Sequence, residues 1–206
     1  MKGLLVVDIQ NDFLPGGALG VPEGDEIIET VNKLQYHNEF DLVVGTQDWH
    51  PADHGSFASQ YEDKKPLDKT TLGGLDQILW PDHCVQGTEG AQFPDQLDTR
   101  KMEAIFRKGM EKDIDTYSAF FDNGHKKDTG LAGYLHARNI DHVYIVGLAG
   151  DFCVNFSIRD ALNEGFKVTL IKDCTRPINK NEFEKVLQEL SELGTEIIGS
   201  GDLLIL

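Results

Sequence analysis

Short runs of hydrophobic residues recur along the chain and predict buried strands. Each run holds four to six residues, too short for a helix, and its hydrophobic positions follow one another without regular alternation. Strands that are covered on both faces of a parallel sheet have this pattern. The predicted strands are 3–8, 42–46, 104–109, 143–147, 168–171 and 196–199.

Hydrophobic residues spaced three or four apart predict helices between these strands. Pro22 suits the first turn of the first helix, and Thr129 is expected to cap the second. Gly165 and Gly194 are expected to end the third and fourth helices. The predicted helices are 22–37, 130–139, 153–164 and 181–193.

This alternation of strands and helices predicts an α/β fold. We expect a three-layer, doubly wound, mainly parallel six-stranded sheet with helices on both faces, and a single domain over residues 1–206. Residues 47–103 interrupt the alternation, because they are rich in Asp, Gly, His and Pro and show little periodicity. A long irregular insertion in a compact domain is more often functional than idle.

The composition excludes several classes of protein. The net charge of −16, from 35 acidic and 19 basic residues, repels nucleic acid and anionic membranes, so we expect neither as a partner. No run approaches the ~20 hydrophobic residues of a membrane span. Three cysteines in a chain of 206 residues do not suggest a disulfide framework, and we expect the protein in a reducing cytoplasm.

Reactive residues stand at the ends of four predicted strands. Asp8 ends the first strand and Asp48 follows the second. Lys108 stands near the end of the third strand, and Cys153 follows the fourth. In an open α/β sheet, ligands bind outside the carboxyl ends of the strands. We therefore expect a base, a cation and a nucleophile, namely Asp8, Lys108 and Cys153, to meet there.

The nucleophile and the base each have a structural alternative. Cys153 could be a small buried hydrophobic residue, which is our interpretation of Cys84 and Cys174. A helix that begins near Cys153 would instead favour its thiolate and offer free N–H groups to an oxyanion. Asp8 could be an ordinary loop residue. Loss of solvation at the end of a hydrophobic strand would instead raise its pKa toward the range useful for a base.

The segment 46–57 predicts a second kind of site, for a divalent metal ion. Asp48 and His50 lie two residues apart, so in extended structure both side chains project from one face. His83 is the best-placed third ligand, and His54 is a fourth ligand or a hydrogen-bond partner of one. Two imidazoles and a carboxylate suit zinc, iron or manganese. The alternative is a polar loop whose histidines only make hydrogen bonds.

Six blocks of sequence follow one another in a specific order. They are D-I-Q-N-D-F (8–13), D-W-H-P-A-D-H-G-S-F (48–57), W-P-D-H-C-V-Q-G-T-E-G (80–90), F-R-K-G (106–109), Y-S-A-F (117–120) and G-L-A-G-D-F-C-V (147–154). Together these blocks resemble the nicotinamidases (pyrazinamidases), cysteine amidohydrolases of the isochorismatase-like superfamily. The resemblance extends from the first strand through the last helix.

The resemblance implies a role for each candidate residue. It also implies that the first and fourth strands are neighbours and that a cis peptide bond precedes Ala149. The implied groups are a catalytic triad of Asp8, Lys108 and Cys153, metal ligands Asp48, His50 and His83 with His54 as a ligand in some relatives, an aromatic pocket of Phe13, Trp80 and Tyr117, and an oxyanion hole of the Ala149 and Cys153 N–H groups.

The activity that the resemblance implies is the hydrolysis of nicotinamide to nicotinate and ammonia through a cysteine thioester. A divalent metal ion, with zinc the leading choice and iron or manganese the alternatives, would orient the pyridine ring. Pyrazinamide would be a further substrate, and the setting would be cytoplasmic NAD salvage. The expected partner is therefore a small molecule, and a homo-oligomer is compatible with the resemblance.

Other activities stay open at this stage. Isochorismatases share the fold but lack the nucleophilic cysteine, so Cys153 argues against that activity. Ureido and carbamoyl amidases share the triad but lack the metal segment, so Asp48, His50 and His83 favour a pyridine carboxamide. A catalytically silent binding protein on the same scaffold is a third alternative, and an intact triad argues against it.

Overall fold

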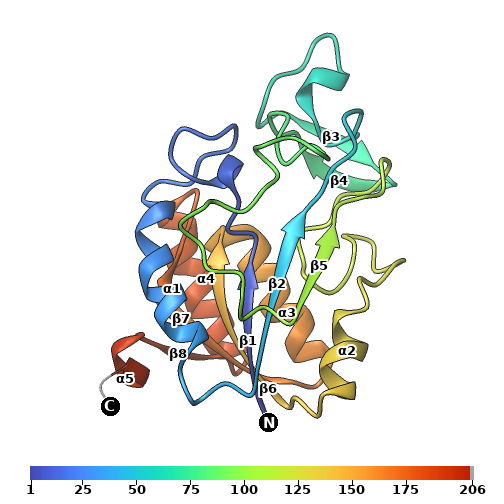
Figure 1. Ribbon diagram of the computed structural model, residues 1–206. Coiled ribbons are helices and arrows are strands. Elements are labelled where there is room, and N and C mark those ends of the chain that lie inside the picture. The colour runs from blue at the N-terminus through green and yellow to red at the C-terminus, as the bar shows by residue number, and fades with distance from the viewer. Residues whose placement is uncertain (205–206) are drawn as a thin grey trace.

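A parallel sheet forms the centre of the computed structural model, which describes residues 1–204 (Figure 1). Within these residues the sheet has six strands in the order β5-β2-β1-β6-β7-β8, and every neighbouring pair is parallel. The predicted fold class and the pairing of the first and fourth strands are therefore confirmed. The strands are β1 Lys2–Val7, β2 Leu42–Asp48, β5 Ala104–Lys108, β6 His142–Leu148, β7 Lys167–Arg176 and β8 Glu196–Ile198.

Helices cover both faces of this sheet and create two hydrophobic cores. Leu4 and Val6 of β1 pack on the side of α1, whereas Leu5 and Val7 pack on the side of α2, α3 and α4. Successive side chains of a strand point to opposite faces, so a continuous hydrophobic run supplies both cores. The helices are α1 Ile28–Gln35, α2 Leu131–Ala137, α3 Asn155–Asn163, α4 Lys180–Glu192 and the short α5 Gly201–Leu204.

The predicted helix ends need small corrections. A 3₁₀ turn over Gly24–Ile27 precedes α1, so this α-helix starts later than Pro22. The third helix begins with a π-helical turn over Gly150–Val154, in which the Val154 N–H donates to the carbonyl of Ala149. The cap position of the second helix is Gly130, not the expected Thr129, although the Thr129 hydroxyl does accept a hydrogen bond from the Leu131 N–H.

The insertion contains a hairpin that the hydrophobic pattern did not predict. Strands β3 Lys69–Leu72 and β4 Leu75–Ile78 pair antiparallel, and Gly73 and Gly74 turn the chain with φ of 62° and 86°. The hairpin lies beyond the carboxyl ends of β2 and β5 (Figure 1). Most of its side chains are exposed or half-buried, so no hydrophobic alternation marks its strands.

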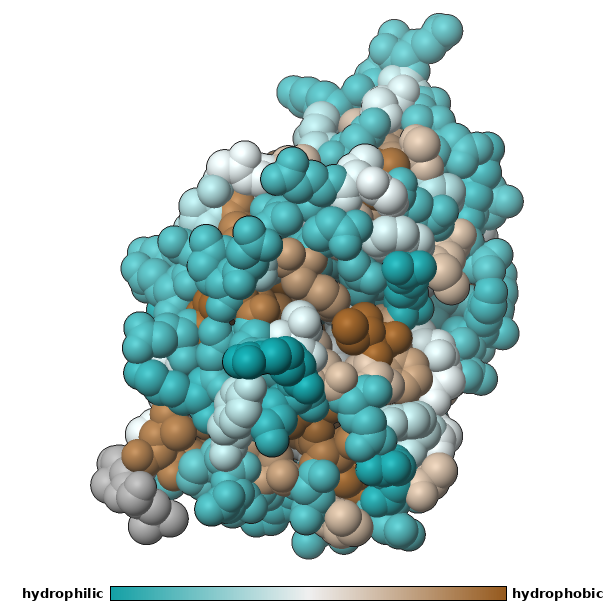
Figure 2. Space-filling model, viewed as in Figure 1, coloured by the Kyte–Doolittle hydropathy of each residue, from teal (hydrophilic) through white to brown (hydrophobic). Residues whose placement is uncertain are grey.

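The visible surface of the molecule is mostly hydrophilic. Hydrophilic residues cover most of the face in Figure 2, with hydrophobic groups scattered among them. Among residues 1–204, no helix combines the length and the hydrophobicity needed to cross a bilayer.

Candidate active site

Three buried side chains meet beyond the carboxyl ends of β1, β5 and β6. The Lys108 ammonium lies 2.9 Å from Asp8 Oδ2 and 3.5 Å from Cys153 Sγ, and it donates to the Thr116 carbonyl at 2.9 Å. Cys153 is 7% exposed and the other two less. The structure therefore brings together the base, cation and nucleophile predicted from the strand ends.

Thr46 of β2 holds Asp8 in place, a contact that the sequence did not reveal. Its hydroxyl donates to Asp8 Oδ1 at 2.6 Å and accepts from the Asp8 N–H at 3.2 Å. The other oxygen, Oδ2, pairs with the Lys108 ammonium, and no hydroxyl or amide among the described residues donates to it. One lone pair of Asp8 thus remains free to take a proton.

Burial and charge set the protonation of these groups. Burial, together with Asp48, raises the pKa of Asp8, although Lys108 acts in the opposite direction. Burial alone would lower the pKa of Lys108, but the carboxylates of Asp48 and Asp8 outweigh it and raise that pKa well above its ordinary value. Lys108 is therefore a permanent cation, and the expected shift of Asp8 has the right direction.

The expected preference of Cys153 for its thiolate is opposite to the shift found. Burial raises the pKa of the Cys153 thiol well above its ordinary value, and the charges of Asp8 and Asp48 add to this effect, while Lys108 opposes it. The resting group is a thiol, so a nearby base must take its proton during attack.

A candidate metal centre lies directly beside this triad. Asp48 Oδ2 lies 2.9 Å from His50 Nε2 and 3.5 Å from His83 Nε2, and Asp48 Oδ1 accepts from Lys108 at 3.1 Å. The ligand atoms of the three residues lie within 4.8 Å of one another, and all three residues are buried. The predicted triplet of Asp48, His50 and His83 thus converges.

Hydrogen bonds at the far side of each ring orient these imidazoles for a metal. His50 Nδ1 lies 2.8 Å from the Gly109 carbonyl, and His83 Nδ1 lies 2.8 Å from the Pro81 carbonyl. A carbonyl only accepts, so Nδ1 of each ring carries a proton, and Nε2 on the side of Asp48 is the nitrogen that would bind a metal ion once it is deprotonated. Gly109, at φ +69°, leaves room for this arrangement, since a Cβ there would lie 2.4 Å from the His50 ring. The residues present fit a divalent ion.

His54 packs against the centre but does not join the triplet. Its Nδ1 lies 2.7 Å from the Ser56 hydroxyl and its Nε2 lies 3.3 Å from the Ile114 carbonyl. Its ring lies tilted against that of His50, with centroids 4.3 Å apart and an interplanar angle of 47°. Its ligand atom groups instead with His50 and Asp115. Burial and the neighbouring His50 lower the pKa of His54 to about 4.

A small cavity is lined by Cys153 of the triad and by Asp48 and His83 of the metal centre. Its free volume is about 20 Å³, roughly room for one water molecule. A larger cavity of about 570 Å³ adjoins it and shares Trp80, Phe152 and Ile178 as a wall. A flat ring therefore enters only if this wall shifts. The small cavity is lined by Phe13, Leu19, Asp48, Trp80, His83, Asp115, Tyr117, Ala149, Phe152, Cys153 and Ile178.

The predicted aromatic pocket residues all line this cavity, and so does Ala149, which follows a cis peptide bond as the resemblance implied. Trp80 and Phe152 meet edge to face with centroids 4.9 Å apart. The sequence did not single out Leu19, Asp115, Phe152 or Ile178. Asp115 and Phe152 lie within two residues of predicted site residues, which was the one signal available for them.

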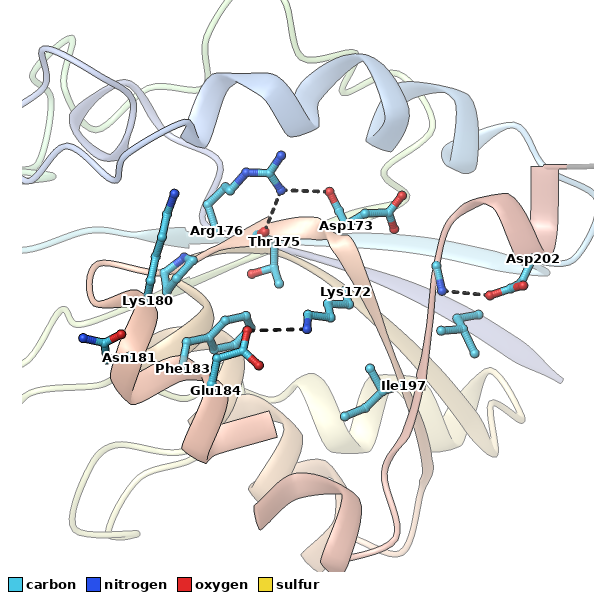
Figure 3. Close-up of a pocket in the computed structure, with 13 residues that line it drawn as sticks. Lys172, Asp173, Thr175, Arg176, Lys180, Asn181, Phe183, Glu184, Ile197 and Asp202 are labelled. Carbon is cyan, nitrogen blue, oxygen red and sulfur yellow. Dashed lines mark hydrogen bonds and ion pairs between the residues drawn. The ribbon is translucent and has the colours of Figure 1, made fainter. Parts of the chain in front are cut away.

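The largest cavity lies elsewhere and carries no such chemistry. It occupies about 680 Å³ between β7, α4 and β8 (Figure 3). Its cations are already engaged, since Lys172 pairs with Glu184 at 3.5 Å and Arg176 donates to the carbonyls of Asp173 and Thr175. Its lining, within the described part of the chain, contains neither cysteine nor histidine.

Comparison with known proteins agrees with this geometry. The isochorismatase domain family matches residues 2–202. A nicotinamidase from Escherichia coli K12 is 43% identical, over 98% of this chain and 96% of the relative.

Two solved structures that share the fold have a bound inhibitor or a bound metal ion. The yeast nicotinamidase Pnc1p bound to the inhibitor nicotinaldehyde has a TM-score of 0.92 and 37% identity, over 97% of this chain and all of that one. The pyrazinamidase of Pyrococcus horikoshii in complex with zinc has a TM-score of 0.77 and 38% identity, over 96% and 98% of the two chains. The resemblance predicted from the six sequence blocks is confirmed: this chain belongs to the isochorismatase family and is similar to its nicotinamidases.

Proposed function

We propose that the protein is a nicotinamidase, which hydrolyses nicotinamide to nicotinate and ammonia. The observation that carries the proposal is the position of Lys108, whose ammonium lies within 3.5 Å of Asp8, Asp48 and Cys153. It joins a nucleophile and a base to a set of metal ligands at one aromatic cavity. The relatives that are nicotinamidases support the same substrate.

The first half of the reaction forms a thioester. As Cys153 Sγ bonds to the carboxamide carbon, its proton passes to Asp8 Oδ2, whose lone pair is free. The N–H groups of Ala149 and Cys153 receive the oxyanion; one such donor is typically worth about 3–4 kcal/mol. When the C–N bond breaks, Asp8 returns the proton to the leaving nitrogen, and ammonia departs.

The second half consumes one water molecule. Asp8 takes a proton from water as the oxygen bonds to the thioester carbon. The C–S bond then breaks, the proton passes from Asp8 to the sulfur, and the product leaves as nicotinic acid, which releases its own proton to solvent to give nicotinate. Lys108 stays protonated throughout and stabilises the negative charge of Asp8 and of the sulfur.

Asp48, His50 and His83 would hold one divalent metal ion in this site. When bound, the ion would offer a coordination position to the pyridine nitrogen and so fix the orientation of the ring. Zinc is our first choice, supported by the pyrazinamidase in complex with zinc, and iron or manganese would suit the same ligands. Phe13, Trp80 and Tyr117 would enclose the ring, and pyrazinamide would fit as well. We place the enzyme in cytoplasmic NAD salvage.

An ammonia-release assay with nicotinamide tests the proposal. The purified protein should release ammonia and nicotinate in equal amounts, and Cys153→Ala should release neither. Cys84→Ala is the matched control, because Cys84 is also buried but does not line the cavity. Near-normal turnover by Cys153→Ala would reject the nucleophile, and an inactive wild type loaded with zinc would reject the substrate.

A further inference from the structure

A single buried residue anchors the β3–β4 hairpin to the rest of the molecule. Among the eight residues of the two strands, all of them described, Gln77 alone is buried, at 4% exposed. A buried anchor on an exposed hairpin would ordinarily be hydrophobic. A buried amide is costly unless its hydrogen bonds are made, so the contacts of Gln77 call for an explanation.

Those contacts reach two residues of the candidate active site. Gln77 Nε2 lies 2.8 Å from Asp115 Oδ2 and 3.0 Å from the Tyr117 hydroxyl, and also 2.7 Å from the Ile78 carbonyl. The Asp115 carboxylate only accepts hydrogen bonds when ionised. It therefore requires the nitrogen side of the amide to face the cavity wall, where the amide donates to the Tyr117 oxygen.

The same Tyr117 oxygen accepts a second hydrogen bond. Trp80 Nε1, which can only donate, lies 3.1 Å away. The two Gln77 Nε2 hydrogens are shared among three acceptors, and with Trp80 Nε1 they put two donors against the phenol oxygen, so the Tyr117 proton points away from both. In residues 1–204 we find no acceptor for that proton, while Tyr117 and Trp80 both line the small cavity. Burial, with the charge of Asp115, raises the pKa of Tyr117 and keeps the proton in place.

We propose that Gln77 is a positioning residue for substrate binding: with Asp115 it fixes the Tyr117 hydroxyl as a donor toward the cavity and holds Trp80 against the ring. The inference rests on the proposed nicotinamidase function and deepens it. Gln77 has no hydrogen bond to Cys153 or Asp8. We therefore expect it to affect the binding of the flat aromatic amide and not the rate of the chemical steps. Without Gln77, the Tyr117 hydroxyl loses one of its two neighbouring donors and is less firmly oriented.

Steady-state kinetics with nicotinamide on a double-mutant cycle tests this role. Gln77→Met keeps the length of the side chain but removes the donor, and Tyr117→Phe removes its acceptor. We expect each single variant to raise KM about three- to tenfold, the range of one hydrogen bond, with kcat within about twofold of wild type. The double variant should be no worse than Tyr117→Phe, because Gln77 acts through that hydroxyl.

Asp76→Asn, one residue away and exposed on the same strand, is the control and should leave KM and kcat unchanged. Thermal unfolding of every variant separates a loss of fold from a loss of binding. An unchanged KM in Gln77→Met, a loss confined to kcat, or additive effects in the double variant would overturn the positioning role. A wild type that releases no ammonia would instead overturn the proposed function, and this inference with it.

Discussion

The Lys108 ammonium lies 2.9 Å from Asp8 Oδ2, and no hydroxyl or amide in residues 1–204 donates to that oxygen. The Thr46 hydroxyl fixes the other oxygen of Asp8. A carboxylate that is anchored on one side and free on the other can exchange a proton repeatedly without moving. The proposed mechanism needs this property, because Asp8 takes and returns a proton in each half of the reaction.

The raised pKa of Asp8 predicts the acid limb of the pH profile. Asp8 must be ionised to accept the Cys153 proton, and burial lifts its pKa above 3.8. As pH falls, kcat/KM should therefore decline tenfold per pH unit once the pH passes below this raised pKa. The profile is measured with excess zinc, so that metal loss does not contribute. A plateau extending below pH 3.8 would contradict the assignment.

Removal of the buried cation should damage both activity and stability. Lys108→Met leaves Asp8 and Asp48 buried without their counter-ion. We expect kcat/KM to fall about 10²- to 10³-fold and the free energy of unfolding to fall by about 3 kcal/mol. Lys112→Met is the control, because Lys112 pairs with Asp53 at the exposed surface and should cost about 1 kcal/mol or less. Equal effects of the two substitutions would argue against a special role for Lys108.

Metal content should distinguish His83 from His54. Since His83 Nε2 faces Asp48 whereas both nitrogens of His54 already have partners, His83→Ala should lose bound zinc and His54→Ala should retain it. The measurement is the ratio of zinc to protein after dialysis, with His37→Ala as a control distant in sequence. Zinc loss in His54→Ala as complete as in His83→Ala would make His54 a ligand.

Asp151 connects the turn that carries Cys153, Gly150–Val154, to the wall of the small cavity. Its carboxylate accepts from the N–H groups of Ile178 at 2.9 Å and Asn179 at 2.8 Å, and Ile178 lines the cavity. Asp151→Ala should lower the free energy of unfolding by about 1–3 kcal/mol, because two partly buried N–H groups lose a charged acceptor, and should raise KM for nicotinamide. The exposed Asp202→Ala should cost only about 0.5 kcal/mol. Denaturant titration checks the first expectation, and an unchanged stability would refute it.

The sequence predicted the sheet well, because its strands are buried on both faces and so read as uninterrupted hydrophobic runs. The strand ends then located Asp8, Asp48, Lys108 and Cys153, because parallel strands share one carboxyl edge. The hairpin was missed since its exposed strands leave no hydrophobic signal, although Gly73–Gly74 is a recognised turn signature.

The supporting contacts could not be predicted from local pattern. Thr46 lies inside an ordinary strand, and its bond to Asp8 depends on the register between β1 and β2. Gln77 meets Asp115 and Tyr117 across about 40 residues of irregular chain. The expected thiolate of Cys153 rested on local helix position in the same way, whereas burial of the sulfur in the folded protein raises the thiol pKa and the nearby carboxylates add to this effect.

Lys108 terminates β5, which is the outermost strand and is bonded to β2 alone. Outer strands detach before central ones do, since fewer backbone bonds retain them. If β5 separated briefly from β2, the Lys108 ammonium would leave the site while the other five strands stayed paired. Activity should therefore be lost at a lower temperature than the midpoint of global thermal unfolding.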